Sequence, residues 1–257
     1  MIKHRLAVKA LRSAFSSART QLAGCFAALL STSLSAFLAA GLAASGLALA
    51  AQAACAATAP TAAPTAVNAA KPMIVVLGDS LSAEYGLPRD TGWVALMRER
   101  LASDRIDYSV ANASISGDTT SGGLARLPLV MQRLKPAIVI VELGANDALR
   151  GVPLSTTDSN LRAIIAEVRK GNAKPMLVGM YVPPNYGPDY TQKFHGLYGQ
   201  LSKELNVPLV PFLLAGLADK PDLFQSDQIH PTQQAQSLLL DNVWPTLKPL
   251  LESGARR

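Results

Sequence analysis

Residues 137–147 read AIVIVELGAND, and this stretch contains the strongest strand signal in the chain. The apolar, β-branched run Ala137–Leu143 ends at Gly144, which is typical of a strand buried on both faces. Four other short apolar runs alternate with segments of helical periodicity: Met73–Leu77, Ile106–Ala111, Met176–Tyr181 and Val207–Phe212. This alternation predicts an α/β fold, a three-layer α/β/α sandwich with a mostly parallel, five-stranded, flavodoxin-like sheet.

Polar segments follow four of the five expected strands. They read GDSLS at 78–82, ASISGD at 113–118, GAND at 144–147 and, across a loop, DQIHP at 227–231. In open α/β sheets, ligands bind outside the carboxyl ends of the strands. We therefore expect these four segments to meet along one edge of the sheet.

The residue types in these segments suit acyl transfer. A serine hydroxyl such as that of Ser80 needs an adjacent base to act as a nucleophile. The expected folded part has two histidines, His195 and His230, and His195 lies beside Phe194 on an expected amphipathic helix. Asp227 precedes His230 by three residues, a spacing that lets one turn of chain direct the carboxylate at the imidazole. The candidate catalytic residues are therefore Ser80, Asp227 and His230.

Acyl transfer also needs donors for the negative charge that develops on the carbonyl oxygen. Three are available: the N–H of Ser80 at an expected helix start, the N–H of Gly117 and the side-chain amide of Asn146. Taken alone, Ser80 also fits a helix N-cap and Asn146 a turn. Glu142 lies in an apolar strand and requires a partner that the sequence does not name.

Taken together, the four segments resemble the blocks of the SGNH (GDSL) hydrolases, in the order of that family. NASISGDTTSGGLARLP at 112–128 and VELGANDALRG at 141–151 resemble its thioesterase I / lysophospholipase / arylesterase branch. The resemblance spans about residues 73–251. It implies a Ser80–His230–Asp227 triad, an oxyanion hole formed by Ser80, Gly117 and Asn146, and no cofactor or metal.

We thus expect a serine esterase or thioesterase that hydrolyses acyl or aryl esters, including lysophospholipids, through an acyl-enzyme. The apolar segments Ala148-Leu149 and Val182-Pro183-Pro184 suggest an acyl chain or aryl group in the cleft. Deacetylation of polysaccharides is an alternative, for which Tyr85 and Tyr186 are the available stacking aromatics. A non-catalytic binding protein on the same fold is an alternative of another class.

The amino-terminal third has a different composition. Residues 1–19 hold five bases and no acid, and Gln21–Ala70 has no charged residue. A basic start, an Ala/Leu-rich middle and Ala51-Gln52-Ala53 predict a secretory signal peptide over 1–53. An uncleaved inner-membrane anchor is the alternative. Residues 54–71 are an expected Ala/Pro/Thr-rich linker, and 72–257 the hydrolase domain.

The charge distribution and the cysteine content exclude further classes of protein. The chain has a net charge of +6, but residues 72–257 hold 18 bases and 18 acids. The excess charge therefore belongs to the export signal, and a nucleic-acid partner loses its support. Two cysteines in 257 residues exclude a disulfide framework. We expect a periplasmic or secreted protein, with a monomer favoured and a small-molecule or lipid ester as the partner.

Overall fold

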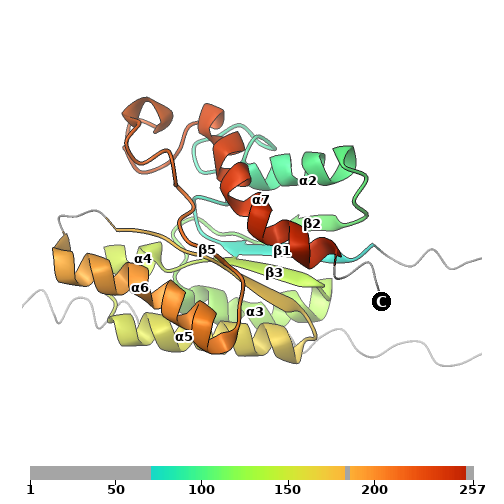
Figure 1. Ribbon diagram of the computed structural model, residues 1–257, viewed down its shortest axis with the longest axis horizontal. Coiled ribbons are helices and arrows are strands. Elements are labelled where there is room, and N and C mark those ends of the chain that lie inside the picture. Colours follow the sequence, from blue (N-terminus) through green and yellow to red (C-terminus); the bar gives the residue numbers. More distant parts are fainter. Residues whose placement is uncertain (1–70, 183–185, 253–257) are drawn as a thin grey trace, which may run out of the picture. The chain divides into compact units, whose positions relative to one another are not determined.

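Five parallel strands form one sheet in the computed structural model, which describes residues 71–182 and 186–252. The order across the sheet is β2-β1-β3-β4-β5 (Figure 1). The strands are β1 Met73–Gly78, β2 Ser109–Asn112, β3 Ile138–Glu142, β4 Lys174–Val178 and β5 Leu209–Val210. All four pairings are parallel, and the order is that of flavodoxin-like sheets. The expected fold class is confirmed.

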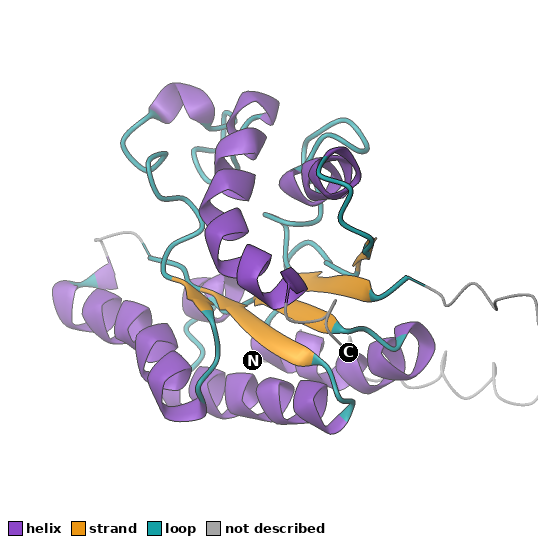
Figure 2. Ribbon diagram, turned by 45° about the vertical axis from the view of Figure 1, so that its right-hand side comes forward, coloured by secondary structure: helices purple, strands orange, loops and turns teal. Residues whose placement is uncertain are grey.

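Helices cover both faces of this sheet. The helices are α2 Trp93–Ser103, α3 Thr120–Leu134, α4 Ala145–Leu149, α5 Leu154–Lys170, α6 Pro188–Leu205 and α7 Gln236–Glu252. Helices α2 and α7 cover one face, and α3, α5 and α6 cover the other (Figures 1 and 2). Short 3-10 helices occupy Pro221–Leu223 and Gln233–Ala235. The central strands β1 and β3 are buried from both sides, as their apolar runs predict.

The chain reverses its direction of winding between β1 and β3. From β1 the chain passes to β2 on one side, and β3 then pairs with the other edge of β1. In the register of that pairing Gly78 lies opposite Glu142, so both central strands end at the same level. Ligands bind at such a switch point in doubly wound folds.

Three strands differ in extent from their expected ranges. β2 begins at Ser109 rather than at Ile106. β5 has only two residues, because Pro208 and Pro211 on either side have no N–H to donate to a neighbouring strand. β4 ends at Val178, so Met180 and Tyr181 lie beyond the sheet rather than in it. A side chain at Gly179 would meet the carbonyl oxygen of Pro211 at 2.4 Å, so the chain segments that directly follow β4 and β5 lie very close together.

The expected signal peptide over 1–53 and all of the expected linker except residue 71 lie outside the described residues. Within the described residues, no helix has the length and apolar character needed to cross a membrane.

Candidate active site

Ser80, His230 and Asp227 form a continuous chain of hydrogen bonds at the carboxyl edge of the sheet. Ser80 Oγ lies 2.9 Å from His230 Nε2, and His230 Nδ1 lies 2.7 Å from Asp227 Oδ2. The structure therefore brings together all three predicted triad residues, although 150 positions separate Ser80 from His230. This geometry allows the imidazole to accept the serine proton while the carboxylate fixes its tautomer.

Asp227 is held by a tight turn of its own segment. Its Oδ1 accepts the backbone N–H groups of Ile229 and His230, both at 3.0 Å, and Gln228 between them has a φ of 56°. The N–H of His230, then its imidazole and the N–H of Ile229, lower the pKa of Asp227 to about 2. Because an unfolded aspartate titrates near 4, the stabilisation by this carboxylate is present above that pH and is lost toward pH 2.

Ser80 lies in a run of turns, not at the start of a helix. Ala83 N donates to the Asp79 carbonyl at 2.9 Å and Leu81 N to Asp79 Oδ1 at 3.0 Å, but the next helix begins only at Trp93. The expectation that the Ser80 N–H lies at the start of a helix is therefore wrong. Asp79 organises the turn instead, since its side chain caps the N–H of Leu81 in the way that aspartate favours.

The three expected oxyanion donors all line one cavity with Ser80 Oγ. In the described part of the chain, the N–H groups of Ser80 and Gly117 donate to no other protein group. Asn146, in the first turn of α4, donates from Nδ2 to Asp79 Oδ2 at 2.9 Å, which leaves a second N–H on the same nitrogen. Three N–H groups are thus available at the cavity.

Gly117 is required by the shape of its loop. Its φ of 78° lies in the left-handed region, where a side chain is strained. Its carbonyl accepts from Arg150 Nη2 at 2.6 Å, so the loop after α4 is tied to the loop that carries Gly117.

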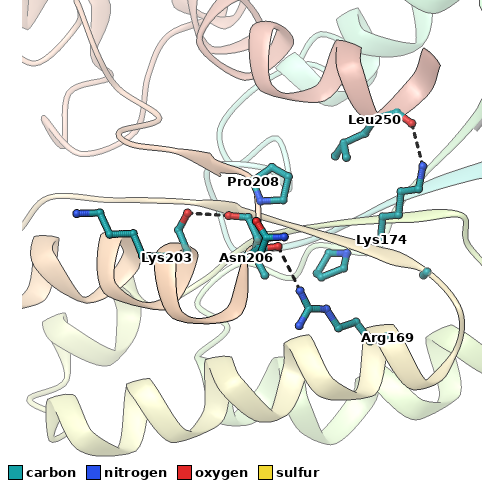
Figure 3. Close-up of a pocket in the computed structure, with 10 residues that line it drawn as sticks. Arg169, Lys174, Lys203, Asn206, Pro208 and Leu250 are labelled. Carbon is teal, nitrogen blue, oxygen red and sulfur yellow. Dashed lines mark hydrogen bonds between the residues drawn. The ribbon is translucent and has the colours of Figure 1, made fainter. Parts of the chain in front are cut away.

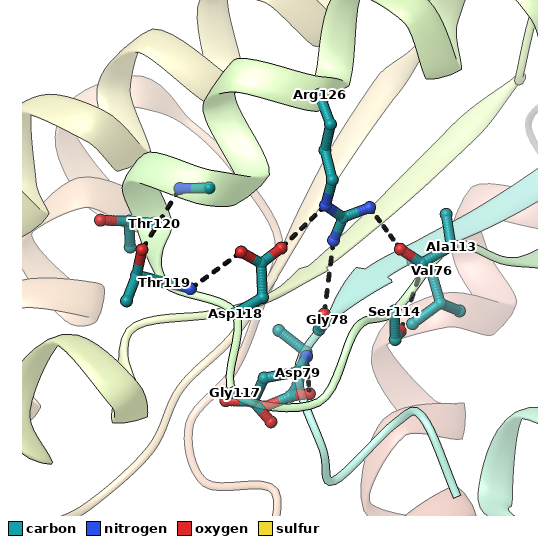
Figure 4. Close-up of polar contacts among 12 residues, drawn as sticks. Val76, Gly78, Asp79, Ala113, Ser114, Gly117, Asp118, Thr119, Thr120 and Arg126 are labelled. Atoms are coloured by element: carbon teal, nitrogen blue, oxygen red, sulfur yellow. Dashed lines mark hydrogen bonds and ion pairs between the residues drawn. The ribbon is translucent and has the colours of Figure 1, made fainter. Parts of the chain in front are cut away.

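Arg126 joins two of the segments that form the site, 78–82 and 113–118 (Figure 4). From α3 it reaches Asp118 through Nε at 2.8 Å, the Gly78 carbonyl through Nη2 at 3.4 Å, and the Ala113 carbonyl through Nη1. Asp118 directly follows Gly117, Gly78 precedes the turn that carries Ser80, and Ala113 directly follows β2. Arg126 was not among the predicted site residues. Its one signal is the position within the 112–128 stretch that resembles the family.

We expect Arg126→Ala to lower the free energy of unfolding by about 1–3 kcal/mol, because it leaves a half-buried carboxylate and two carbonyls unpaired. Misplacement of the loops should also lower kcat/KM by about tenfold. Urea unfolding and ester hydrolysis measure the two effects. The matched control is Arg162→Ala, whose partners Asp158 and Glu204 lie on the surface of α5 and α6. Equal losses of activity in both variants would contradict the positioning role.

The hydrogen-bond partners of Glu142 lie in the turn that carries Ser80. It is fully buried, and its Oε2 accepts from Ser82 Oγ at 2.8 Å and from the Asp79 N–H at 3.3 Å. A side chain at Gly78 would meet both Glu142 Oε2 and Ser82 Oγ at 2.8 Å. Gly78 thus provides the space in which the carboxyl group sits.

The cavity beside Ser80 has a volume of about 720 Å³ and a largely apolar lining. Its apolar members include Leu81, Leu149, Met180, Val182, Phe212, Leu214 and Phe224. Leu149 and Val182 belong to the two apolar segments that the sequence places at the cleft, and Pro183 and Pro184 lie outside the described residues. Tyr85 also lines the cavity, 4.4 Å from the His230 ring, whereas Tyr186 is not part of the lining.

His195 is placed behind the cavity wall. Its Nε2 lies 2.7 Å from the Tyr181 hydroxyl, and the two rings stack with 3.7 Å between their centroids. Tyr181 itself lines the cavity and packs edge-on against Phe212. His195 thus supports an aromatic wall and does not contact Ser80.

A second hollow, of about 640 Å³, lies at the amino-terminal end of β4, the opposite edge of the sheet (Figure 3). Two of its basic side chains bind backbone carbonyls: Arg169 contacts Leu205 and Asn206 at the end of α6, and Lys174 contacts Leu250. Cations at helix carboxyl ends stabilise the exposed carbonyls there. We assign this hollow a structural role.

The sequence was compared with known families and proteins. The profile of the GDSL-like Lipase/Acylhydrolase family matches residues 76–238. Esterase TesA of Pseudomonas aeruginosa is 49% identical over 183 residues, which cover 71% of this chain and 91% of that protein. Thioesterase 1/protease 1/lysophospholipase L1 of Escherichia coli K12 is 43% identical over 183 residues, which cover 71% of this chain and 86% of that protein.

Solved structures give the same result. A crystal structure of TesA matches with a TM-score of 0.68 at 49% identity, over 70% of this chain and 99% of that one. The esterase EstA from Pseudoalteromonas sp., inhibited by monoethylphosphonate, matches with a TM-score of 0.68 at 40% identity, over 71% of this chain and 100% of that one.

Proposed function

Because this chain belongs to the GDSL-like lipase/acylhydrolase family and is a serine esterase or thioesterase, we propose that Ser80 is its nucleophile. His230 is the general base and Asp227 orients it. The observation that carries this assignment is the hydrogen-bonded series Asp227–His230–Ser80, which opens onto an apolar cavity. No other histidine in the described residues contacts a serine at this edge.

The reaction proceeds in two displacements. His230 Nε2 takes the proton of Ser80 Oγ as that oxygen attacks the carbonyl carbon. The tetrahedral intermediate collapses when the alcohol or thiol leaves with the proton from His230, and an acyl-Ser80 ester remains. Water then attacks this ester with His230 again as base, and the carboxylic acid departs as Ser80 recovers its proton.

The negative charge of each tetrahedral intermediate falls on the former carbonyl oxygen. The N–H groups of Ser80 and Gly117 and the Nδ2–H of Asn146 that does not bind Asp79 are its proposed donors. Because these donors are fixed before substrate binds, they stabilise the charge without reorganising at the moment of reaction.

Labelling with a fluorophosphonate probe tests the nucleophile. We expect the wild-type protein to bind one probe per chain and Ser80→Ala to bind none, as measured by intact mass. An unlabelled wild type favours the non-catalytic binding protein, and labelling that persists in Ser80→Ala places the nucleophile elsewhere.

The substrate proposed for the cavity is an acyl or aryl ester, with thioesters and lysophospholipids as further candidates. Its apolar lining supports an acyl chain or an aromatic group better than a sugar. Among the relatives, one is named esterase, one thioesterase and lysophospholipase, and one arylesterase. Deacetylation of a polysaccharide remains the rival, with Tyr85 as the stacking aromatic that lines the cavity.

A panel of p-nitrophenyl esters from acetyl to palmitoyl tests the acyl site. We expect kcat/KM to peak beyond butyryl, because each buried methylene contributes about 0.8 kcal/mol. Ala218→Trp should lower the ratio of long-chain to short-chain activity by roughly tenfold, since Ala218 is exposed at the cavity lining. Ala215→Trp, on the same loop but outside the lining, is the control. A maximum at acetyl, or equal effects of both variants, contradicts an acyl site.

We further propose that residues 1–53 act as an export signal, that 54–71 tether the hydrolase domain over 72–257, and that the mature protein is a periplasmic or secreted monomer. The basic, then uncharged composition of the first seventy residues supports export. Amino-terminal sequencing of the exported protein should begin at Ala54. An intact amino terminus in the membrane fraction supports the anchor instead.

A further inference from the structure

Glu142 is a buried carboxyl group that the proposed mechanism does not use. It has no solvent exposure, and its Oε1 has no hydrogen-bond donor among the residues that the structure describes. None of the ion pairs in the described residues includes Glu142. An unpaired, ionised carboxylate in such a place is costly. A proton on Glu142 removes that cost.

The group that faces Glu142 is another buried carboxyl. Asp79 is 1% exposed, and its backbone N–H donates to Glu142 Oε2 at 3.3 Å. A side-chain hydrogen bond with Glu142 lowers the pKa of Asp79, and the same bond raises the pKa of Glu142. Two ionised carboxylates in contact repel, whereas one shared proton turns the contact into a strong hydrogen bond. The remaining hydrogen bonds of Asp79 come from donors: Leu81 N to Oδ1 and Asn146 Nδ2 to Oδ2.

The surroundings decide which of the two carboxyl groups holds the proton. Burial raises the pKa of Asp79 to about 6, against the opposing effects of the Leu81 N–H, His230 and Asn146. Burial, together with the charge of Asp79, raises the pKa of Glu142 well above its usual range. Tyr198 also lies close enough to interact with both carboxyl groups, and its phenol supplies no positive charge. Both oxygens of Asp79 accept hydrogen bonds, whereas Glu142 Oε1 has no donor in the described residues, so Glu142 is the group better placed to hold the proton.

We propose that Glu142 is a neutral carboxylic acid in the folded protein and donates a hydrogen bond to the Asp79 carboxylate, which in turn fixes the side-chain amide of Asn146. An ionised Asp79 accepts hydrogen bonds only, so the nitrogen of Asn146 and not its oxygen must face it. The second N–H of that nitrogen is then directed away from Asp79, as the oxyanion site requires. Glu142 is thus a positioning residue, and this role rests on the oxyanion assignment under the proposed function.

The variants Glu142→Gln and Glu142→Leu distinguish a neutral Glu142 that donates a hydrogen bond to Asp79 from an ionised Glu142. Glutamine keeps an N–H donor for Asp79 and an oxygen for Ser82, so kcat should stay within about threefold of the wild type. Leucine removes the donor to Asp79. We expect kcat to fall by at least about tenfold, less than the loss of an oxyanion donor itself. The acid limb of the kcat–pH profile should also move to higher pH, because Asp79 loses a hydrogen bond that favours its ionised form.

A second measurement does not depend on activity or on the folding of Glu142→Leu. Because an unfolded glutamate ionises near pH 4.3, a native protein with neutral Glu142 takes up one proton on folding at neutral pH. The folding equilibrium constant of the wild type should fall about tenfold per pH unit relative to that of Glu142→Gln between pH 6.5 and 8. Urea unfolding across this range measures the difference. Glu204→Gln is the matched control, because Glu204 is exposed and its pKa is lowered, and it should keep the wild-type dependence.

Each outcome decides the proposal. Equal pH dependence in the wild type and Glu142→Gln shows an ionised Glu142 and overturns it. A tenfold loss of kcat in Glu142→Gln, or an unchanged acid limb in folded Glu142→Leu, overturns the positioning role. Full activity of Ser80→Ala would instead refute the proposed nucleophile, and the pH dependence of unfolding would still report the protonation of Glu142.

Discussion

Ser80→Ala is expected to lower kcat/KM for p-nitrophenyl butyrate by about 10⁵-fold, the largest effect of any single substitution in the chain. Without Oγ no acyl-enzyme can form, and only the oxyanion donors and substrate binding remain to accelerate hydrolysis. The fold should not suffer, because the Ser80 hydroxyl contacts only His230 Nε2 within the described residues. Initial rates on enzyme purified away from host esterases measure the effect, with the melting temperature as the check on folding.

The members of the triad act as one unit, so their losses should not add. His230→Ala should cost about as much as Ser80→Ala, and the double variant should be no slower than either single variant. Additive losses would mean that His230 serves another step than activation of Ser80. A Ser80→Ala enzyme with more than a hundredth of the wild-type rate would refute the mechanism.

Outside the triad, Asn146→Ala should have the largest effect, a fall in kcat of about 10²–10³-fold with little change in KM. The reason is that the amide meets its charged partner only when the carbonyl oxygen becomes an oxyanion, so ground-state binding is hardly affected. Steady-state kinetics over a range of ester concentrations separates the two parameters.

Asn242→Ala is the matched control for this prediction. The Asn242 amide also donates two hydrogen bonds, to the carbonyls of Leu213 and Ala215, but it lines no part of the cavity. We expect it to lower stability by about 1–2 kcal/mol without changing kcat. A proportional rise in KM for Asn146→Ala would show that the amide binds substrate and transition state alike.

Much of the fold could be predicted from the sequence because its signals are local. A buried parallel strand needs an unbroken apolar run, so β1 and β3 are found nearly to the residue. Where the run contains prolines, as around β5, the strand is much shorter than its apolar length. The end of β4 was misplaced because Met180 and Tyr181 are apolar for another purpose, the lining of the cavity.

The candidate site also has parts that could be predicted from the sequence and parts that could not. The spacing of Asp227 and His230 is enough to predict their contact, since three residues form one turn. The turn after β1 was expected to begin a helix, because a Ser followed by apolar residues resembles an N-cap. In the structure, the Asp79 side chain accepts the N–H of Leu81 within that turn. No helix begins at Ser80, because the next helix starts at Trp93.

By itself, the sequence determined the class of fold, the residues available for acyl transfer and their order along the chain. It did so because apolar period, turn chemistry and short motifs act over a few neighbouring positions. Only the tertiary structure decided the pairing of Gly78 with Glu142, the contact of Ser80 with His230, and the bonds of Arg126 to the end of β1 and to the loop after β2. These contacts join residues far apart in the chain, so they depend on how the strands pair and the helices pack.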